Sequence, residues 1–489
     1  MSKRLINVLS GRSFFYVVIL LTIIQSIWFV VSVKYAIPAD ETYHFKFIEY
    51  YSIQPFFSGP IISDQGSDSF YLGDIERIPS YLYHYLLSFP YRIANWLELS
   101  MEASVLALMS VSVLFTISSL NVLRKTTLII SKGNEMLSNS VVLLMTLTGM
   151  FTWIGASINY DSLSILTFYC FLFYLVKLIN GERYQNYYFL LVTLGISSIL
   201  IKVTIYPSIL FAVILGLAIL LRTRKEELPT KYKLTSSQVA KRSLIVILMT
   251  IIVTLFGERI IKNAVIYQSL NPSCDTIHRV EDCLNNAIFK REVEQKKQLT
   301  ESSLNGKQIK VDYRYFVKRW PKIMYDRLYF FFGHKTIPPD RSAFTSVFAA
   351  IFISIASIII KRRTVLENSA EKIIFVVAVF YVALLFTFNL MHYMKYGAIL
   401  GGYQGRYLLP AVPFLYYFLF KLFFVTSESY KSNVFKTVYV SICAITVLWF
   451  SYKHFPPKVF IEGTNATWYT NSTREFNLNL KSRWQNLTD

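Results

Sequence analysis

The chain has 489 residues, of which 54% are hydrophobic and 16% charged, and its mean hydropathy is +0.41. Soluble domains carry about 25% charged residues, so this composition excludes an ordinary soluble protein. A formal net charge of +20 would indicate nucleic-acid binding in a soluble protein. In a membrane protein it indicates Lys and Arg retained in cytoplasmic loops.

Long apolar runs predict an all-α integral membrane protein with about eleven membrane-spanning helices. A run of about 20 apolar residues crosses a hydrocarbon core of about 30 Å. The first run follows Lys3, Arg4 and Arg12, but it is longer than the apolar region of a secretory signal, so we expect a retained helix. The predicted helices are 14–33, 103–122, 139–157, 161–180, 186–201, 204–221, 243–261, 343–360, 373–391, 406–425 and 434–451.

Basic residues in the short loops predict the orientation of the chain. With the N-terminus inside, the loops near residues 124–132, 222–242 and 361–372 are cytoplasmic, and each is rich in Lys and Arg as the positive-inside rule requires. We therefore expect the N-terminus in and the C-terminus out. The prediction divides the chain into a transmembrane domain, 1–451, with outer loops 34–102 and 262–342, and a C-terminal outer tail, 452–489.

An acidic pair follows the first predicted helix. Asp40 and Glu41 lie in Ile-Pro-Ala-Asp-Glu-Thr-Tyr-His, where Asp40 has the N-cap position of a helix that contains His44. One interpretation is that Asp40 only caps the helix and Glu41 is an ordinary acidic residue in its first turn. The other is a general base at the membrane surface. Further along this loop, Tyr83 and His84 lie in an aromatic amphipathic segment, which predicts interfacial anchors or, alternatively, a groove for a lipid tail or a sugar.

Three later motifs place polar residues at the same predicted membrane face. Asn159 and Asp161 precede a predicted helix in Asn-Tyr-Asp-Ser. Lys202 lies between two apolar runs, where a lysine is costly unless it is paired; the alternative is a lysine that reaches the headgroups. In Gly-Gly-Tyr-Gln-Gly-Arg-Tyr-Leu-Leu-Pro, Arg406 is expected to open a transmembrane helix and to bind a phosphate bidentately; the alternative is a turn with an interfacial arginine.

The four cysteines fit this arrangement. Cys170 and Cys443 fall inside predicted helices, whereas Cys274 and Cys283 lie nine residues apart in the middle outer loop. In an oxidising compartment, this second pair is expected to form a disulfide. The sequence contains no Cys/His cluster with zinc spacing and no P-loop or dinucleotide fingerprint.

Taken in order, these motifs resemble a family of bacterial polytopic membrane proteins in the C-type (GT-C) glycosyltransferase superfamily. The layout is also similar to that of O-antigen-modifying glucosyltransferases. The resemblance rests on Pro-x-Asp-Glu-x-x-His-Phe, Asn-Tyr-Asp-Ser, Lys202 before Tyr-Pro, and Gln-Gly-Arg-Tyr-Leu-Leu-Pro, and it covers roughly residues 10–425. It implies a GT-C-like fold with interfacial helices, and transfer of a sugar from a polyprenyl-phosphate donor (undecaprenyl phosphate in bacteria) to a surface glycan such as the O-antigen of lipopolysaccharide. It also implies a location in the inner membrane of a bacterium, with the active site and the tail 452–489 on the periplasmic side.

The resemblance also implies residue roles. The base would be Asp40 or Glu41, with Asp40 slightly favoured. Arg406 and Lys202, supported by Gln404 and Tyr407, would bind the donor phosphate. The acceptor or the base would be oriented by His44, Asp161, Asn159, Tyr83 and His84. No cofactor is expected, although some superfamily members use a divalent metal ion.

Two rival functions share the substrate class. A flippase or transporter of a lipid-linked sugar usually has two similar halves, and the sequence shows no such repeat. An O-antigen polymerase or ligase usually concentrates its arginines in a late outer loop, and the basic 262–342 segment keeps that alternative open.

Overall fold

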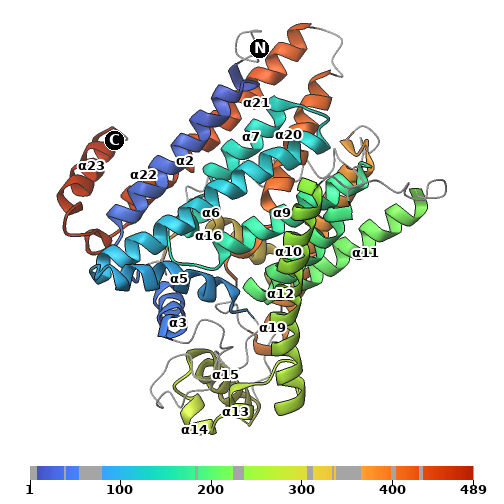
Figure 1. The fold of residues 1–489 in the computed structure, drawn as a ribbon. Coiled ribbons are helices and arrows are strands. Elements are labelled where there is room, and N and C mark those ends of the chain that lie inside the picture. The colour runs from blue at the N-terminus through green and yellow to red at the C-terminus, as the bar shows by residue number, and fades with distance from the viewer. Residues whose placement is uncertain are drawn as a thin grey trace.

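The structure is a computed structural model in which a bundle of long helices carries smaller helices at one end (Figure 1). The described part of the chain comprises residues 8–37, 40–53, 80–181, 185–223, 236–304, 312–332, 335–337, 365–397, 403–428 and 433–487.

Six helical segments in this part of the chain are long and apolar enough to cross a membrane. The protein is therefore membrane-embedded and built almost entirely of helices. The six spans are α2 (Arg12–Ser32), α6 (Met101–Ile130), α9 (Asp161–Ile179), Val203–Arg222, Arg242–Ile266 and α19 (Ser369–Tyr396). Short η1 (Val203–Ile205) and α11 (Tyr206–Thr223) form the fourth span, and α12 (Ser236–Ile266) contains the fifth.

The expected count of eleven spans is not confirmed. Two predicted spans form apolar helices shorter than 18 residues, in α10 (Gln185–Ile201) and α20 (Val412–Glu428). The last predicted span coincides with α21 (Asn433–Lys453), which is not among the six. The predicted helix 343–360 lies outside the described residues.

The predicted helix 139–157 is broken into α7 (Glu135–Thr146) and α8 (Gly149–Gly155), which meet at 71°. At the break, the Thr152 hydroxyl donates to the Thr146 carbonyl over 2.9 Å. Gly149 lies so close to another helix that a Cβ there would be 2.6 Å from the Tyr329 carbonyl oxygen. The two α7–α8 segments count as one span at most, which gives seven.

The end of the bundle at which α2 ends and α6 begins carries smaller elements, and we call it the site end. α3 (Glu41–Ile53) packs beside α5 (Leu82–Trp96) there (Figure 1). The 262–342 loop forms α15 (Ala287–Leu304), α16 (Tyr313–Tyr329) and the antiparallel strands β1 (Phe331–Phe332) and β2 (Lys335–Thr336).

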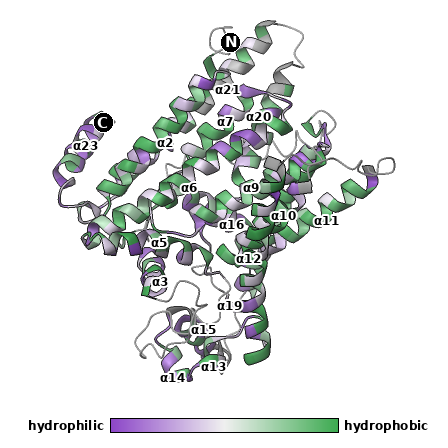
Figure 2. Ribbon diagram, viewed as in Figure 1, coloured by the Kyte–Doolittle hydropathy of each residue, from purple (hydrophilic) through white to green (hydrophobic). Residues whose placement is uncertain are grey.

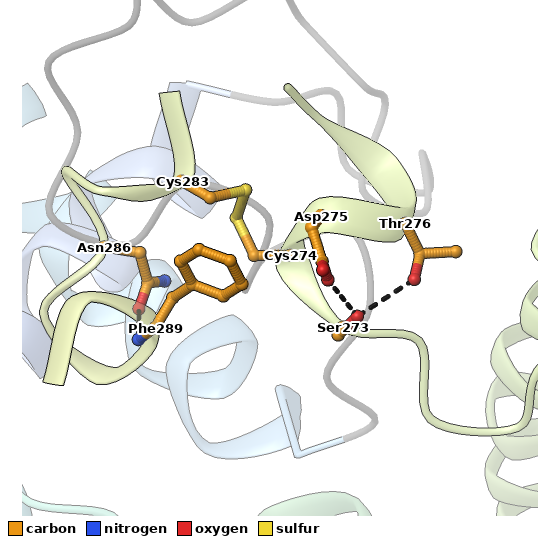
Figure 3. The surroundings of a disulfide bond; sticks show 7 residues. All are labelled: Ser273, Cys274, Asp275, Thr276, Cys283, Asn286 and Phe289. Atoms are coloured by element: carbon orange, nitrogen blue, oxygen red, sulfur yellow. Dashed lines mark hydrogen bonds between the residues drawn. A yellow bond between two sulfur atoms is a disulfide. The ribbon is translucent and has the colours of Figure 1, made fainter. Parts of the chain in front are cut away.

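The predicted disulfide is present. Cys274 and Cys283 join the short helices α13 (Cys274–Ile277) and α14 (Val280–Cys283), and the Ser273 hydroxyl beside them bonds Asp275 and Thr276 (Figure 3). This loop contains more hydrophilic residues than the spans (Figure 2). Cys170 lies within α9 and Cys443 within α21, as predicted.

The tail 452–489 folds back onto the first span. It contains α22 (Pro456–Gly463), η3 (Ala466–Trp468) and α23 (Arg474–Asn486). The Thr470 amide donates to the Ser32 carbonyl over 2.9 Å, and the Lys34 amide donates to the Trp468 carbonyl over 3.0 Å. The tail thereby fixes the exit of α2, from which the chain runs to Asp40.

At the opposite end of the bundle, the buried carboxylate of Glu371 joins two helices. Glu371 forms a capping box with Asn368 at the start of α19. It also accepts from Lys421 Nζ over 2.5 Å and from the Tyr417 hydroxyl over 2.8 Å. These bonds tie α19 to α20 and mark a polar end of both helices.

Candidate functional site

Four segments that are distant in the sequence bring two cations and two carboxylates together at the site end. Asp40 immediately precedes α3, and Asp161 is the first residue of α9. Lys202 lies between α10 and η1, and Arg406 lies in η2 (Gly405–Leu408). The four residues form a continuous chain of ion pairs with equal positive and negative charge.

Arg406 is the centre of this chain. Its Nη2 lies 2.5 Å from Asp40 Oδ2, and its Nε lies 3.5 Å from Asp161 Oδ2. The side chain is only 4% exposed, yet Nε and Nη1 make no hydrogen bond to any described residue. Burial opposes the charge, but Tyr407, Asp161 and Asp40 together raise the pKa of Arg406 above its usual value. A buried guanidinium with unused donors is suited to binding an oxyanion.

Lys202 occupies the second cationic position, as the sequence led us to expect. Its Nζ donates to Asp161 Oδ1 and lies over two aromatic rings, 4.5 Å from the centroid of Tyr407 and 5.3 Å from that of Tyr160. The interpretation of a lysine that reaches the headgroups is wrong, because the side chain is buried and paired. Tyr160 was not singled out from the sequence; its position next to Asp161 was the available signal.

Arg406 does not open a transmembrane helix, contrary to the prediction. It lies in the 3₁₀ turn η2, and α20 begins six residues later, at Val412. Pro410 and Pro413 flank that start, and a proline favours the first turn of a helix over its interior. Arg406 therefore lies outside the first turn of α20, and the positive end of the α20 dipole does not act at the Arg406 side chain.

The position of η2 is fixed by α16. Gly405 lies against the α16 backbone, and a Cβ there would be 2.3 Å from the Arg327 carbonyl carbon and the Leu328 nitrogen. Arg327 Nη1 donates to the Tyr403 carbonyl over 2.5 Å. Arg327 was missed in the sequence, because it lies in the basic 262–342 loop without a recognisable motif.

The two acids of the Asp40–Glu41 pair have different surroundings. Asp40 has a left-handed backbone conformation, with φ of 62°, and its side chain is 41% exposed. Glu41 is fully buried, and its two carboxylate oxygens accept from the Ala36 amide over 3.1 Å and the Ile158 amide over 2.9 Å. Burial raises the pKa of Glu41 to about 7, against the lowering effect of these two bonds.

Glu41 therefore connects the chain after α2 to the turn before α9, whereas Asp40 faces the cation. The predicted helix start at Glu41 is confirmed. The His44 amide donates to the Asp40 carbonyl, so the backbone of Asp40 contributes to the first turn while its carboxylate binds Arg406.

His44 and His84 form a buried pair beside this cluster. His44 Nδ1 lies 2.9 Å from His84 Nε2, and the His44 ring contacts Tyr160 edge-on with 4.6 Å between centroids. Burial lowers the pKa of both histidines, and the positive charges of Arg406 and Lys202 lower that of His44 further. His44 Nε2 makes no hydrogen bond to the residues that the structure describes.

The interpretation of Tyr83 and His84 as interfacial anchors is wrong. Both are buried between α3, α5 and α6, because their helix packs its aromatic face against protein. The Tyr83 hydroxyl lies 3.4 Å from the Ser112 hydroxyl of α6. His84 reaches the site only by its contact with His44, and the Tyr83 hydroxyl points to α6.

The two remaining candidates, Asn159 and Gln404, precede helical turns. Asn159 Oδ1 accepts from the Asp161 amide over 2.9 Å, which fixes the start of α9. Gln404 has the N-cap position of η2, and its Oε1 makes no hydrogen bond within the described ranges. Asn159 is thus a positioning residue for Asp161, and Gln404 presents an unused acceptor close to Arg406.

No group of three or more His, Cys, Asp or Glu that could hold a metal ion is found among the described residues. In comparisons with known proteins, no family model and no curated protein matches the chain.

Proposed function

We propose that the protein is a membrane glycosyltransferase of the GT-C type, which moves a sugar, a hexose such as glucose, from a polyprenyl-phosphate donor to a cell-surface glycan such as O-antigen. The reaction takes place at the site end, on the periplasmic face of the bacterial inner membrane. The proposal rests on the sequence resemblance and on the chemistry of the Asp40–Arg406–Asp161–Lys202 cluster.

The observation that carries the proposal is the position of Arg406. Its buried guanidinium lies between two carboxylates at one end of the membrane helices and keeps two donors without hydrogen bonds. A lipid that is anchored in the membrane presents its phosphate at this depth. The phosphate can bond the unused donors of Arg406 and the ammonium group of Lys202, which lie on either side of Asp161.

The contrast between the two acids favours Asp40 as the base. Both oxygens of Glu41 are occupied by backbone amides and are closed to solvent, so Glu41 cannot approach an acceptor without losing them. Asp40 is partly exposed and is held by a single cation. A donor phosphate on the unused donors of Arg406 shares the positive charge of the guanidinium and so weakens its pair with Asp40, which makes the Asp40 carboxylate available.

The reaction then proceeds with inversion. Asp40 takes the proton of an acceptor hydroxyl while the hydroxyl oxygen forms a bond to the anomeric carbon. The bond from that carbon to the phosphate oxygen breaks, and polyprenyl phosphate leaves with the electron pair. Negative charge develops on the departing phosphate, and Arg406 and Lys202 stabilise it in a buried setting, where such stabilisation contributes most to the rate.

The test is glycan analysis of bacteria that produce the lipid-linked donor and express the full chain. Asp40→Asn is expected to abolish the added sugar while the rest of the glycan stays intact. Glu49→Gln is the matched control, because Glu49 lies in α3, the helix that Asp40 precedes, and its exposed carboxylate pairs only with Lys46 among the described ion pairs. It is expected to retain full transfer.

Other outcomes identify the rival functions. A loss of glycan chain length in Asp40→Asn would indicate a polymerase or ligase, and a loss of export would indicate a flippase. Full transfer by Asp40→Asn, at wild-type protein levels, would contradict the role given to Asp40.

A further inference from the structure

Helix α16 (Tyr313–Tyr329) has one face against the protein and an opposite face that is basic. Phe316, Trp320 and Met324 are buried at intervals of four residues, so they form one side of the helix. The other side carries Arg314 and Lys318, one turn apart, with Arg319 and Tyr315 beside them, and these four residues are exposed. The face is therefore cationic, with an exposed aromatic ring within it.

Helix α16 contacts α19 in the second half of that span. Phe316 contacts Phe386 and Tyr393 with centroid distances of 5.4 Å and 5.1 Å, and Trp320 contacts Phe386 at 5.2 Å. Helix α19 begins at Ser369, next to the polar cluster around Glu371. At 1.5 Å per residue, Phe386 is about 26 Å and Tyr393 about 36 Å along this helix. A hydrocarbon core of about 30 Å that began at Ser369 would end between these two residues, so the contacts of α16 lie on either side of the point where this span would enter the headgroup region.

A cationic helix face at headgroup depth is complementary to anionic lipid. Each Lys or Arg near an anionic membrane surface contributes about 1 kcal/mol to binding, and Tyr is favoured at the same depth. On α16, Asp312 precedes this basic face. Asp326 follows Arg319 by two turns on the same side of the helix and interacts electrostatically with it. Helix α15 differs, because Glu292 and Glu294 alternate with its basic residues.

We infer that the basic face of α16, formed by Arg314, Tyr315, Lys318 and Arg319, binds the headgroups of anionic phospholipids in the leaflet at the site end. This inference does not depend on the proposed sugar transfer. It assigns a role to the basic part of the 262–342 loop, for which the resemblance gave none. It also concerns η2, because the same helix lies against Gly405 through Arg327 and Leu328.

The first experiment measures thermal unfolding of the full-length protein in detergent, with added phosphatidylglycerol or phosphatidylcholine. A ligand that binds the folded state raises Tm, so phosphatidylglycerol is expected to raise Tm more than phosphatidylcholine does. The triple variant Arg314→Gln/Lys318→Gln/Arg319→Gln is expected to lose at least half of this difference. High salt is expected to reduce it as well, because the charges are exposed.

The matched control is Lys290→Gln/Lys296→Gln/Lys297→Gln on α15, which removes the same charge from exposed positions of the same loop. It is expected to keep the wild-type response to phosphatidylglycerol. An equal loss in both triple variants would overturn the inference, because it would show a general effect of net charge. An undiminished response of the α16 variant would overturn it as well.

A second experiment needs no variant and localises the contact. Hydrogen exchange is measured on the wild-type protein in nanodiscs of phosphatidylcholine, with and without phosphatidylglycerol. Slower exchange in residues 313–322 with phosphatidylglycerol, and unchanged exchange in α15, is the expected result. No change in α16 would overturn the inference. Protection of α16 by a soluble anionic glycan but not by phosphatidylglycerol would also overturn it, and would assign the face to an acceptor.

Discussion

Arg406 Nη2 and Asp40 Oδ2 lie 2.5 Å apart although 366 positions separate them in the sequence. The first loop after α2 is thus joined directly to the turn before α20. Because Arg406 also contacts Asp161, a single side chain connects three parts of the chain. The site therefore depends on the fork of a guanidinium and not on positive charge alone.

We predict that Arg406→Lys reduces sugar transfer at least about 100-fold, the loss typical of a removed charge-stabilising donor. One ammonium cannot bond Asp40, Asp161 and a phosphate with the geometry of a guanidinium. Arg124→Lys is the control, since Arg124 also bonds two partners, Glu135 and Asn139, but it does so between α6 and α7. Comparable transfer by both variants, in glycan analysis at equal protein levels, would contradict the prediction.

Lys202 and Asp161 are predicted to be coupled in stability. Lys202→Met leaves the buried Asp161 with a single, longer contact to Arg406, and breaking a buried ion pair costs about 3 kcal/mol or more. The double variant Lys202→Met/Asp161→Asn removes the unpaired charge and is expected to recover at least half of the lost stability. Thermal unfolding measures the effect, and additive losses in the double variant would show that the pair is not coupled.

The buried Glu41 predicts a specific dependence of stability on pH. Its pKa is raised from 4.5 to about 7 in the folded protein, so the folded state binds more protons than the unfolded state between these values. The contribution of Glu41 is therefore fully present below pH 4.5 and is lost as pH rises to 7, by up to about 3 kcal/mol.

The test compares wild type with Glu41→Gln in thermal unfolding from pH 4.5 to 8. The histidines titrate in both proteins, so their opposite effect cancels in the difference. The stability advantage of wild type is expected to shrink as pH rises towards 7 and to stay constant above it. A difference that is independent of pH would show that Glu41 does not titrate in this range.

Gly405→Ala is predicted to destabilise the protein by about 2 kcal/mol, in the range of overpacked buried sites. The added Cβ would lie 2.3 Å from backbone atoms of Arg327 and Leu328, and backbone atoms, unlike a side chain, cannot rotate away from the clash. Gly257→Ala is the control, because a Cβ at Gly257 would meet nothing within 4 Å and the residue lies inside α12. Thermal unfolding is expected to show a lower Tm for the first variant only.

The sequence alone predicted the residues of the cluster better than their contacts. Lys202 was identified because a lysine between apolar runs needs a partner, and the structure provides Asp161. The sequence also predicted that Asp40, Asp161, Lys202 and Arg406 lie at one end of the helices, and in the structure they do. These predictions succeeded because hydropathy locates the ends of the helices in the sequence, and polar residues at the same end of several helices lie near one another.

Other features depend on packing, which a single sequence does not reveal. At the bend between α7 and α8, Gly149 lies against the backbone of Tyr329, 180 residues away in the sequence. Hydropathy alone predicted one continuous helix there, and it predicted anchors at Tyr83 and His84, which are buried. The difference between Asp40 and Glu41 likewise depends on amides of Ala36 and Ile158, which have no signature in the sequence.

The attachment of the C-terminal tail to the first span has a consequence for biogenesis. The Thr470 hydroxyl donates to the Val31 carbonyl over 2.7 Å, and 439 positions separate the two residues. During synthesis, the end of α2 therefore lacks this partner until Thr470 has been made. The backbone that leads from α2 to Asp40 gains this attachment only from that stage on.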